Sequence, residues 1–155
     1  SEILFSSDLG TFKFQSEGVN GSIWKVVRYC ETAHRGIFNL AFGDLLGAED
    51  LDDVVISDNG DRDKVLATVA KTVYAFLDRY PKRTVIFQGS SASRTRLYRM
   101  AINKALDELL LVFEIKGLVR KEDQKIHVQH FQPGVNYEAF LVRKRLAVEY
   151  ANPPP

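Results

Sequence analysis

The sequence predicts one α+β domain, with two amphipathic helices packed on one face of a largely antiparallel sheet. Three observations support this prediction. Alternating apolar and polar residues mark strands near both ends of the chain, two segments with helical spacing lie between them, and a short β-like run separates the two helices. The strand between the helices can run parallel to a neighbour, which would make the sheet mixed.

Three strands are predicted before the first helix. Residues 11–17 and 22–30 alternate in polarity, and the apolar run at 37–42 forms the third strand. Residues 43–53 are predicted to be a loop. The N-terminal third therefore reads as an antiparallel meander.

The first helix is predicted over residues 62–80, where apolar side chains recur at steps of three and four. Asn59 or Asp61 can cap it, and Pro81 ends it. A strand follows at residues 84–87. The second helix has a buried face formed by Tyr98, Ala101, Ile102, Ala105, Leu106 and Leu109.

Three further strands are predicted at residues 112–119, 125–131 and 137–145, separated by the turns RKED and QPGVN. We expect a single globular domain over residues 1–150. The NPPP ending places residues 151–155 in a disordered tail.

Composition limits the functional classes. The chain has 155 residues, 45% of them hydrophobic, and lacks an apolar run of the roughly 20 residues that cross a bilayer. Its single cysteine excludes an internal disulfide and fits a reducing compartment. We therefore expect a cytoplasmic protein without membrane association. A net charge of +1 argues against nucleic-acid binding through bulk charge.

Charge is nevertheless segregated along the chain. Residues 44–63 contain eight acids against Arg62 alone, whereas residues 79–106 contain seven bases and no acid. The two stretches can face each other or water. Alternatively, the basic stretch produces a local positive field with a function.

The basic stretch includes QGSSASRTRLYRM, residues 88–100, which follows a predicted strand and opens a predicted helix. Gly89 permits a tight exit from the strand, and the serines can cap the helix. Free N–H groups at a helix start, together with arginines, suit an anion. The predicted ligand-binding residues are Gly89, Ser90, Ser91, Ser93, Arg94, Arg96 and Arg99.

Helical spacing puts Arg94 in line with the buried Tyr98, whereas Arg96 and Arg99 are expected to point outward. Arg94 can therefore hold a ligand or pair with an internal carboxylate. Polar positions at strand ends that can meet Arg94 are Asp44 with Asn39, and Asn136 with Tyr137 and Glu138. Asp44 or Glu138 would make either a structural ion pair or half of a catalytic pair with it. The segment fits neither the Walker P-loop nor the G-x-S-x-G nucleophile elbow.

Four segments carry a resemblance to a known family: FNLAFGD, NGDRDKVLATVA, VIFQGSSASRTRLYRMAI and NYEAFLVRKR. Together they resemble a small, single-domain bacterial family of unknown function, over most of residues 12–145. Because no activity is assigned to that family, the resemblance implies no catalytic residue.

Our leading hypothesis is a non-catalytic binding or interaction module with an anion-binding turn at residues 89–99. Its partner is an anionic small molecule, a nucleic acid, an acidic protein or a second copy of the chain. The alternative is a small enzyme acting on a nucleotide or nucleic-acid phosphate, with Arg94 and Arg96 holding phosphate. A carboxylate or histidine in the same cleft would favour the enzyme. We expect no cofactor and no metal site.

Overall fold

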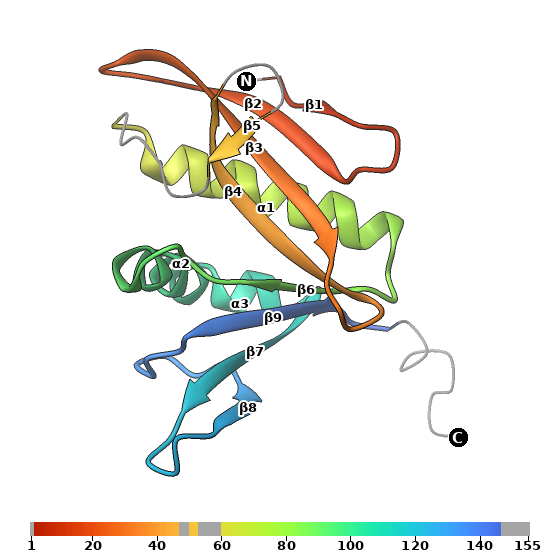
Figure 1. The fold of residues 1–155 in the computed structure, drawn as a ribbon, viewed down its shortest axis with the longest axis vertical. Helices are drawn as coiled ribbons and strands as arrows, with labels where there is room; N and C mark the ends of the chain where they lie inside the picture. Colours follow the sequence, from red (N-terminus) through yellow and green to blue (C-terminus); the bar gives the residue numbers. More distant parts are fainter. Residues whose placement is uncertain (1, 47–49, 53–59, 147–155) are drawn as a thin grey trace.

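The structure, a computed structural model, describes residues 2–46, 50–52 and 60–146 (Figure 1). It confirms the α+β class. The predicted cap Asn59 and the predicted tail at 151–155 lie outside the described residues. The strands are β1 (Leu4–Phe5), β2 (Thr11–Gly18), β3 (Gly21–Glu31), β4 (Ile37–Leu46), β5 (Asp50–Asp52), β6 (Thr84–Phe87), β7 (Phe113–Arg120), β8 (Ile126–His130) and β9 (Ala139–Lys144), and the helices are α1 (Arg62–Arg79), α2 (Ala92–Lys104) and α3 (Leu106–Leu110).

The described strands form one mixed sheet in the order β1-β2-β3-β4-β6-β9-β7-β8, with β5 paired to β4. Strands β2 to β4 make the predicted antiparallel meander, and β1, which was not predicted from the sequence, adds to it antiparallel to β2. Strand β6 runs parallel to β4, opposite residues 37–39. The pairings of β6, β9, β7 and β8 are antiparallel. The parallel pairing thus joins two antiparallel halves of the sheet.

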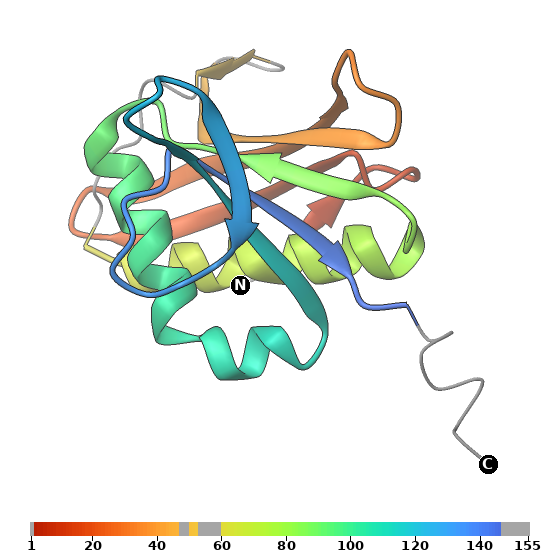
Figure 2. The ribbon, with the colours of Figure 1, turned by 90° about the horizontal axis from the view of Figure 1, so that it is seen from below.

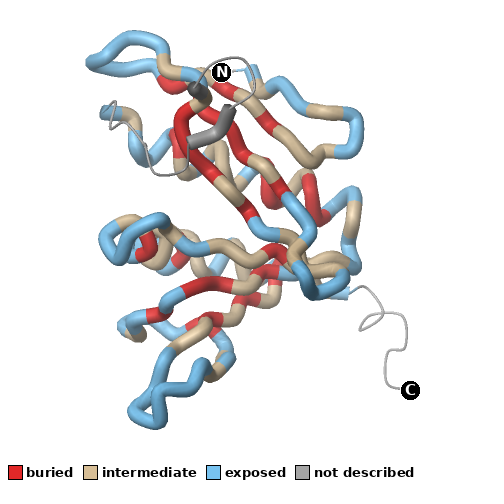
Figure 3. The backbone as a smooth tube through the Cα atoms, viewed as in Figure 1, coloured by how far each residue is buried: buried red, intermediate tan, exposed pale blue. Residues whose placement is uncertain are grey.

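The described helices α1, α2 and α3 lie on one side of this sheet (Figure 2). Helix α1 contacts both halves: Phe76 stacks on Tyr29 of β3 at 4.2 Å between ring centroids, and Tyr74 packs on Phe113 of β7 at 4.7 Å. The predicted helical stripe is confirmed, because Val65, Val73, Phe76 and Leu77 are buried. Figure 3 shows buried residues on the central strands and exposed ones at the hairpin tips.

Two local predictions were wrong. The second helix is not continuous, because Ala105 leaves the helical conformation (φ −107°, ψ 15°) and separates α2 from α3. This break lets the leucines of α3 pack against the core. Residues 43–53 are not all loop, since β4 continues to Leu46. Its extension gains a backbone partner in β5, which pairs with residues 44–46.

The connection between β8 and β9 folds back onto the helical side of the sheet. There the ring of Tyr137 lies so close to Gly117 of β7 that an added Cβ would be 2.2 Å from it. Tyr137 also packs on Phe131 and Phe140. Its hydroxyl accepts hydrogen bonds from the side chain of Gln129 and from a backbone N–H of the connection. Gly117 is therefore needed because a ring occupies the space of a side chain.

The N-terminal half buries polar groups instead. Lys25 of β3 is 1% exposed and forms an ion pair with Asp44 of β4, which is 4% exposed. Nearby, Ser16 donates to the carboxylate of Asp61 at 2.7 Å. Asp61 is the N-cap residue of α1, as predicted, but its side chain makes no capping hydrogen bond. The carboxylate instead ties the helix start to β2.

Candidate functional site

The turn from β6 into α2 is built by Ser91, the N-cap residue of α2. Ser91 has an extended backbone (φ −146°, ψ 164°), and its hydroxyl accepts from the N–H of Arg94 at 3.3 Å. Its carbonyl accepts from the N–H of Thr95 at 3.0 Å. The predicted capping role of the serines is therefore filled by Ser91, whereas Ser93 is exposed.

Gly89 lies directly against the first turn of α2. Its N–H donates to the hydroxyl of Thr95 at 3.0 Å. A Cβ at Gly89 would lie 2.4 Å from the backbone nitrogen of Thr95, far inside contact distance. Glycine is needed here because the strand exit touches helix backbone. Thr95 is the buried anchor of this contact, and the sequence analysis did not identify it.

The three arginines of α2 are in different environments. Arg94 is partly buried and donates to the hydroxyl of Ser90, within the turn. Arg96 is exposed, as expected. Arg99 does not point outward, because it donates to the side-chain oxygen of Asn136 at 2.7 Å. That contact docks α2 on the connection between β8 and β9, so the outward prediction for Arg99 was wrong.

A cleft of about 140 Å³ lies beside the turn. One wall is formed by β4 and another by the turn that follows β6, and Tyr98 of α2 also lines the cleft. The cleft is lined by Asn39, Leu40, Ala41, Phe42, Gln88, Gly89, Ser90 and Tyr98. Of the predicted site residues, Gly89 and Ser90 line the cleft, and Arg94 reaches it through Ser90.

The cleft forms where β4 and β6 diverge. Pairing between them ends at Asn39 and Ile86. Beyond this point β4 continues, while β6 ends at Phe87 and the chain turns into α2. Asn39 of β4 and Gln88, which follows β6, are exposed and line the cleft from the two sides of this divergence. Of the β4 wall, only Asn39 was named from the sequence, because the wall depends on which distant strands are neighbours.

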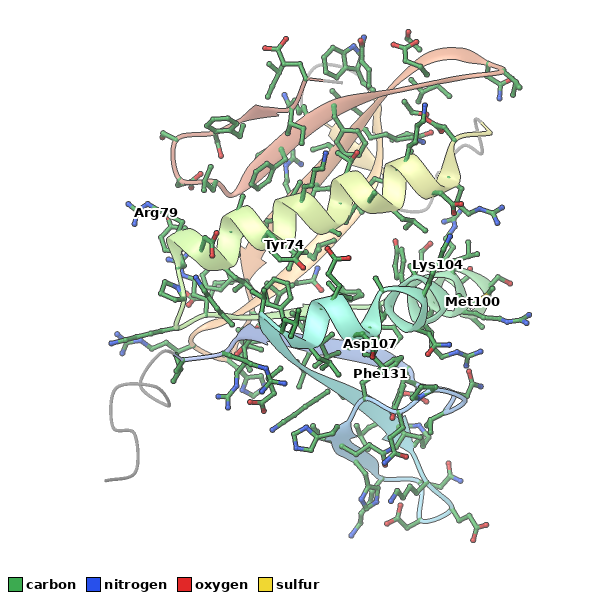
Figure 4. All side chains as sticks on the ribbon, turned by 180° about the vertical axis from the view of Figure 1, so that it is seen from behind. Tyr74, Arg79, Met100, Lys104, Asp107 and Phe131 are labelled. Atoms are coloured by element: carbon green, nitrogen blue, oxygen red, sulfur yellow. The ribbon has the colours of Figure 1, made fainter. Side chains whose placement is uncertain are left out.

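The two carboxylates considered as partners of Arg94 each contact another basic side chain. Asp44 is paired with Lys25, and Glu138 accepts from Arg120 at 3.2 Å. The acidic and basic stretches meet at the exposed Asp63 and Lys104, whose charged atoms are 4.0 Å apart. Figure 4 shows Lys104 on α2, on the helical side of the molecule.

The described residues contain no cluster of side chains that could together bind a metal ion. No group of three or more histidine, cysteine, aspartate or glutamate side chains is placed to hold an ion among them. His127 contacts Asp123 at 3.0 Å on the β7–β8 hairpin, far along the sheet from β4.

These features define a class: a mixed-sheet α+β domain with a small polar cleft where two parallel strands diverge. The chain belongs to the family described as a family of unknown function (DUF6934), whose model matches residues 2–145. No curated protein and no solved structure matches the chain. Among the described helices, none is long and apolar enough to cross a membrane.

Proposed function

We propose that this protein is a non-catalytic binding module that holds an anionic group in the cleft beside the turn at residues 88–90. The observation that carries the proposal is the contact between Arg94 and Ser90. It holds a guanidinium next to Ser90, at a cleft whose lining residues are all uncharged. A guanidinium recognises carboxylate and phosphate through paired N–H donors.

The start of α2 adds to this positive potential. The first N–H groups of a helix have no acceptor in the preceding turn, and the helix dipole is positive at that end. The hydroxyl of Ser91 accepts from the backbone N–H of Arg94. The N–H groups of Ala92 and Ser93 precede that capped position and favour negative charge near the turn.

The size and lining of the cleft favour binding over the enzymatic alternative. Pockets that enclose drug-sized ligands have volumes of roughly 300–1,000 Å³. At about 140 Å³, this cleft suits an anionic end group better than a whole nucleotide. The described residues that line it include neither a carboxylate nor a histidine that could act as a general base.

Thermal unfolding in the presence of anions tests the proposal. Phosphate, pyrophosphate and short oligonucleotides are added to the native protein and to two variants. We expect phosphate or pyrophosphate to raise the Tm of the native protein, since a ligand at ten times its Kd stabilises by about 1.4 kcal/mol.

Arg94→Ala and Arg96→Ala form a matched pair of variants. Arg94→Ala should lose the anion-dependent rise. Arg96→Ala should keep most of it, because Arg96 is exposed and the side chain that donates to Ser90 of the cleft is that of Arg94. A native protein whose Tm responds to none of these anions would refute the proposal. Stabilisation by oligonucleotides but not by phosphate or pyrophosphate would indicate binding at another surface and would contradict the proposed cleft.

A further inference from the structure

The edge of β4 that faces the cleft presents backbone groups for a further strand. The carbonyl of Ile37 accepts from Thr32 on the β3 side, whereas the carbonyl of Gly36 accepts from Thr84 on the β6 side. Because successive residues of a strand direct their polar groups to opposite edges, Phe42 shares the β6-side direction of Gly36. Phe42 therefore directs an N–H and a C=O toward the cleft, where no described strand pairs with it.

Described strands close this edge at both ends. Pairing with β6 ends at residue 39, and pairing with β5 begins at residue 44. The four intervening residues span roughly 13 Å of strand edge. An extended chain lying along this gap meets β6 at one end and β5 at the other, so the gap suits the end of a chain better than its middle.

The charge of the cleft selects which chain end fits. Ser90, the guanidinium of Arg94 and the start of α2 all lie at the β6 end of the gap. A negative group is favoured there and a positive group is not. A peptide with its carboxyl terminus at this end runs antiparallel to β4, in the direction that β5 already takes.

We propose that the cleft binds the C-terminal end of an extended partner peptide. One residue near its end exchanges backbone hydrogen bonds with Phe42, as a hydrogen-bonded antiparallel pair does. The terminal carboxylate contacts Ser90 and Arg94. Strand addition supplies affinity from the main chain, and the carboxylate fixes the register. This proposal rests on the proposed function, because it assigns the anion of the same cleft.

The test starts from an array of hexapeptides synthesised with free carboxyl ends. The tightest-binding hexapeptide is then prepared as the free acid and as the C-terminal amide. Binding is followed by NMR of ¹⁵N-labelled protein, reading the backbone N–H signals of Phe42 and Gly89. We expect both signals to shift with the free acid, and the amide to bind at least tenfold more weakly.

Two variants complete the test. Arg94→Ala should weaken binding of the free acid at least tenfold, whereas Arg96→Ala should leave it within about twofold. Equal binding of acid and amide, or a Phe42 signal that does not move, would overturn the inference.

The outcomes also separate this inference from the proposed function. If phosphate stabilises the protein through Arg94 but no hexapeptide binds, the peptide assignment is wrong and the anion site stands. If neither phosphate nor any hexapeptide binds, both proposals fall.

Discussion

The two halves of the sheet fill their cores in different ways. The N-terminal half, β1 to β4 under α1, places charged and hydroxyl groups inside: Lys25 pairs with Asp44, and the hydroxyl of Tyr29 lies 2.8 Å from that of Thr72. Burial raises the pKa of Tyr29, so this phenol stays neutral. In this half, stability depends on polar groups that need their partners.

The C-terminal half depends on shape. Phe87, Phe140, Phe131 and Tyr137 form a chain of ring contacts with centroids 5.3–6.1 Å apart. Gly117 provides the space for the last ring. The contrast predicts that charge changes are most harmful in one half and volume changes in the other.

Lys25→Met gives the largest expected effect. It leaves Asp44 as a buried charge without its lysine, so we expect the free energy of unfolding to fall by about 3–5 kcal/mol. Urea denaturation at pH 7 measures it. The double variant Lys25→Met/Asp44→Leu removes both charges and should recover most of the loss. A double variant as unstable as the single one would show that the pair acts through packing.

Gly117→Ala tests the half that depends on shape. The new methyl group would overlap the ring of Tyr137, and overpacking of this kind lowers stability by about 1–3 kcal/mol. Adding Tyr137→Leu should make the alanine less harmful than it is beside tyrosine, which denaturation of the four-member mutant cycle measures. If the stability losses of Gly117→Ala and Tyr137→Leu simply add, the ring of Tyr137 is not what makes the alanine harmful.

Gly89→Ala tests the junction between the halves. Its methyl group would meet helix backbone at Thr95, so we expect a loss of about 1–2 kcal/mol together with weaker anion binding. Ser93→Ala, on the exposed side of the same turn, is the control and should change stability by less than about 0.5 kcal/mol. Similar stabilities for the two variants would contradict the close contact.

The smallest expected change in stability is at Glu114 of β7, in the C-terminal half. Hydrogen bonding from Arg143 holds the pKa of Glu114 below its ordinary value of 4.5, with a further contribution from Lys116. A lowered carboxyl pKa stabilises the fold above the unfolded-state pKa, and that stability is lost as the pH falls through the lower folded-state pKa.

Glu114→Gln should therefore reduce stability near pH 7 by less than about 1 kcal/mol and flatten its decline below about pH 4.5. Tm measured from neutral to acidic pH for both proteins checks this. If the Tm of the two proteins falls by the same amount between neutral and acidic pH, Glu114 has no role in acid unfolding.

Local periodicity was sufficient for most of the fold. The stripe of α1 follows from side-chain spacing, the strand at residues 84–87 was predicted from a short β-like run, and its parallel neighbour was anticipated. The break at Ala105 was not, because a helical pattern continues through it and only docking of the leucines of α3 favours the turn.

The candidate site was only partly predictable. The turn at Gly89 and Ser90 has local signals, because glycine and serine between a strand and a helix are typical of such turns. The β4 wall was anticipated only at Asn39, since residues 40–42 face the turn only through the pairing of β4 with β6. The contact of Arg99 with Asn136 likewise joins segments that are distant in sequence.

The parallel pairing of β4 with β6 is a mechanical seam. It spans three residue pairs, fewer than the seven that join β3 to β4, and α1 reinforces it from behind by contacting both halves. A force pulling the halves apart would load this seam first. The N–H of Thr84, bonded to Gly36, would exchange with solvent when the seam opens. Since the cleft begins where the seam ends, an occupant that bridges both walls would slow that exchange.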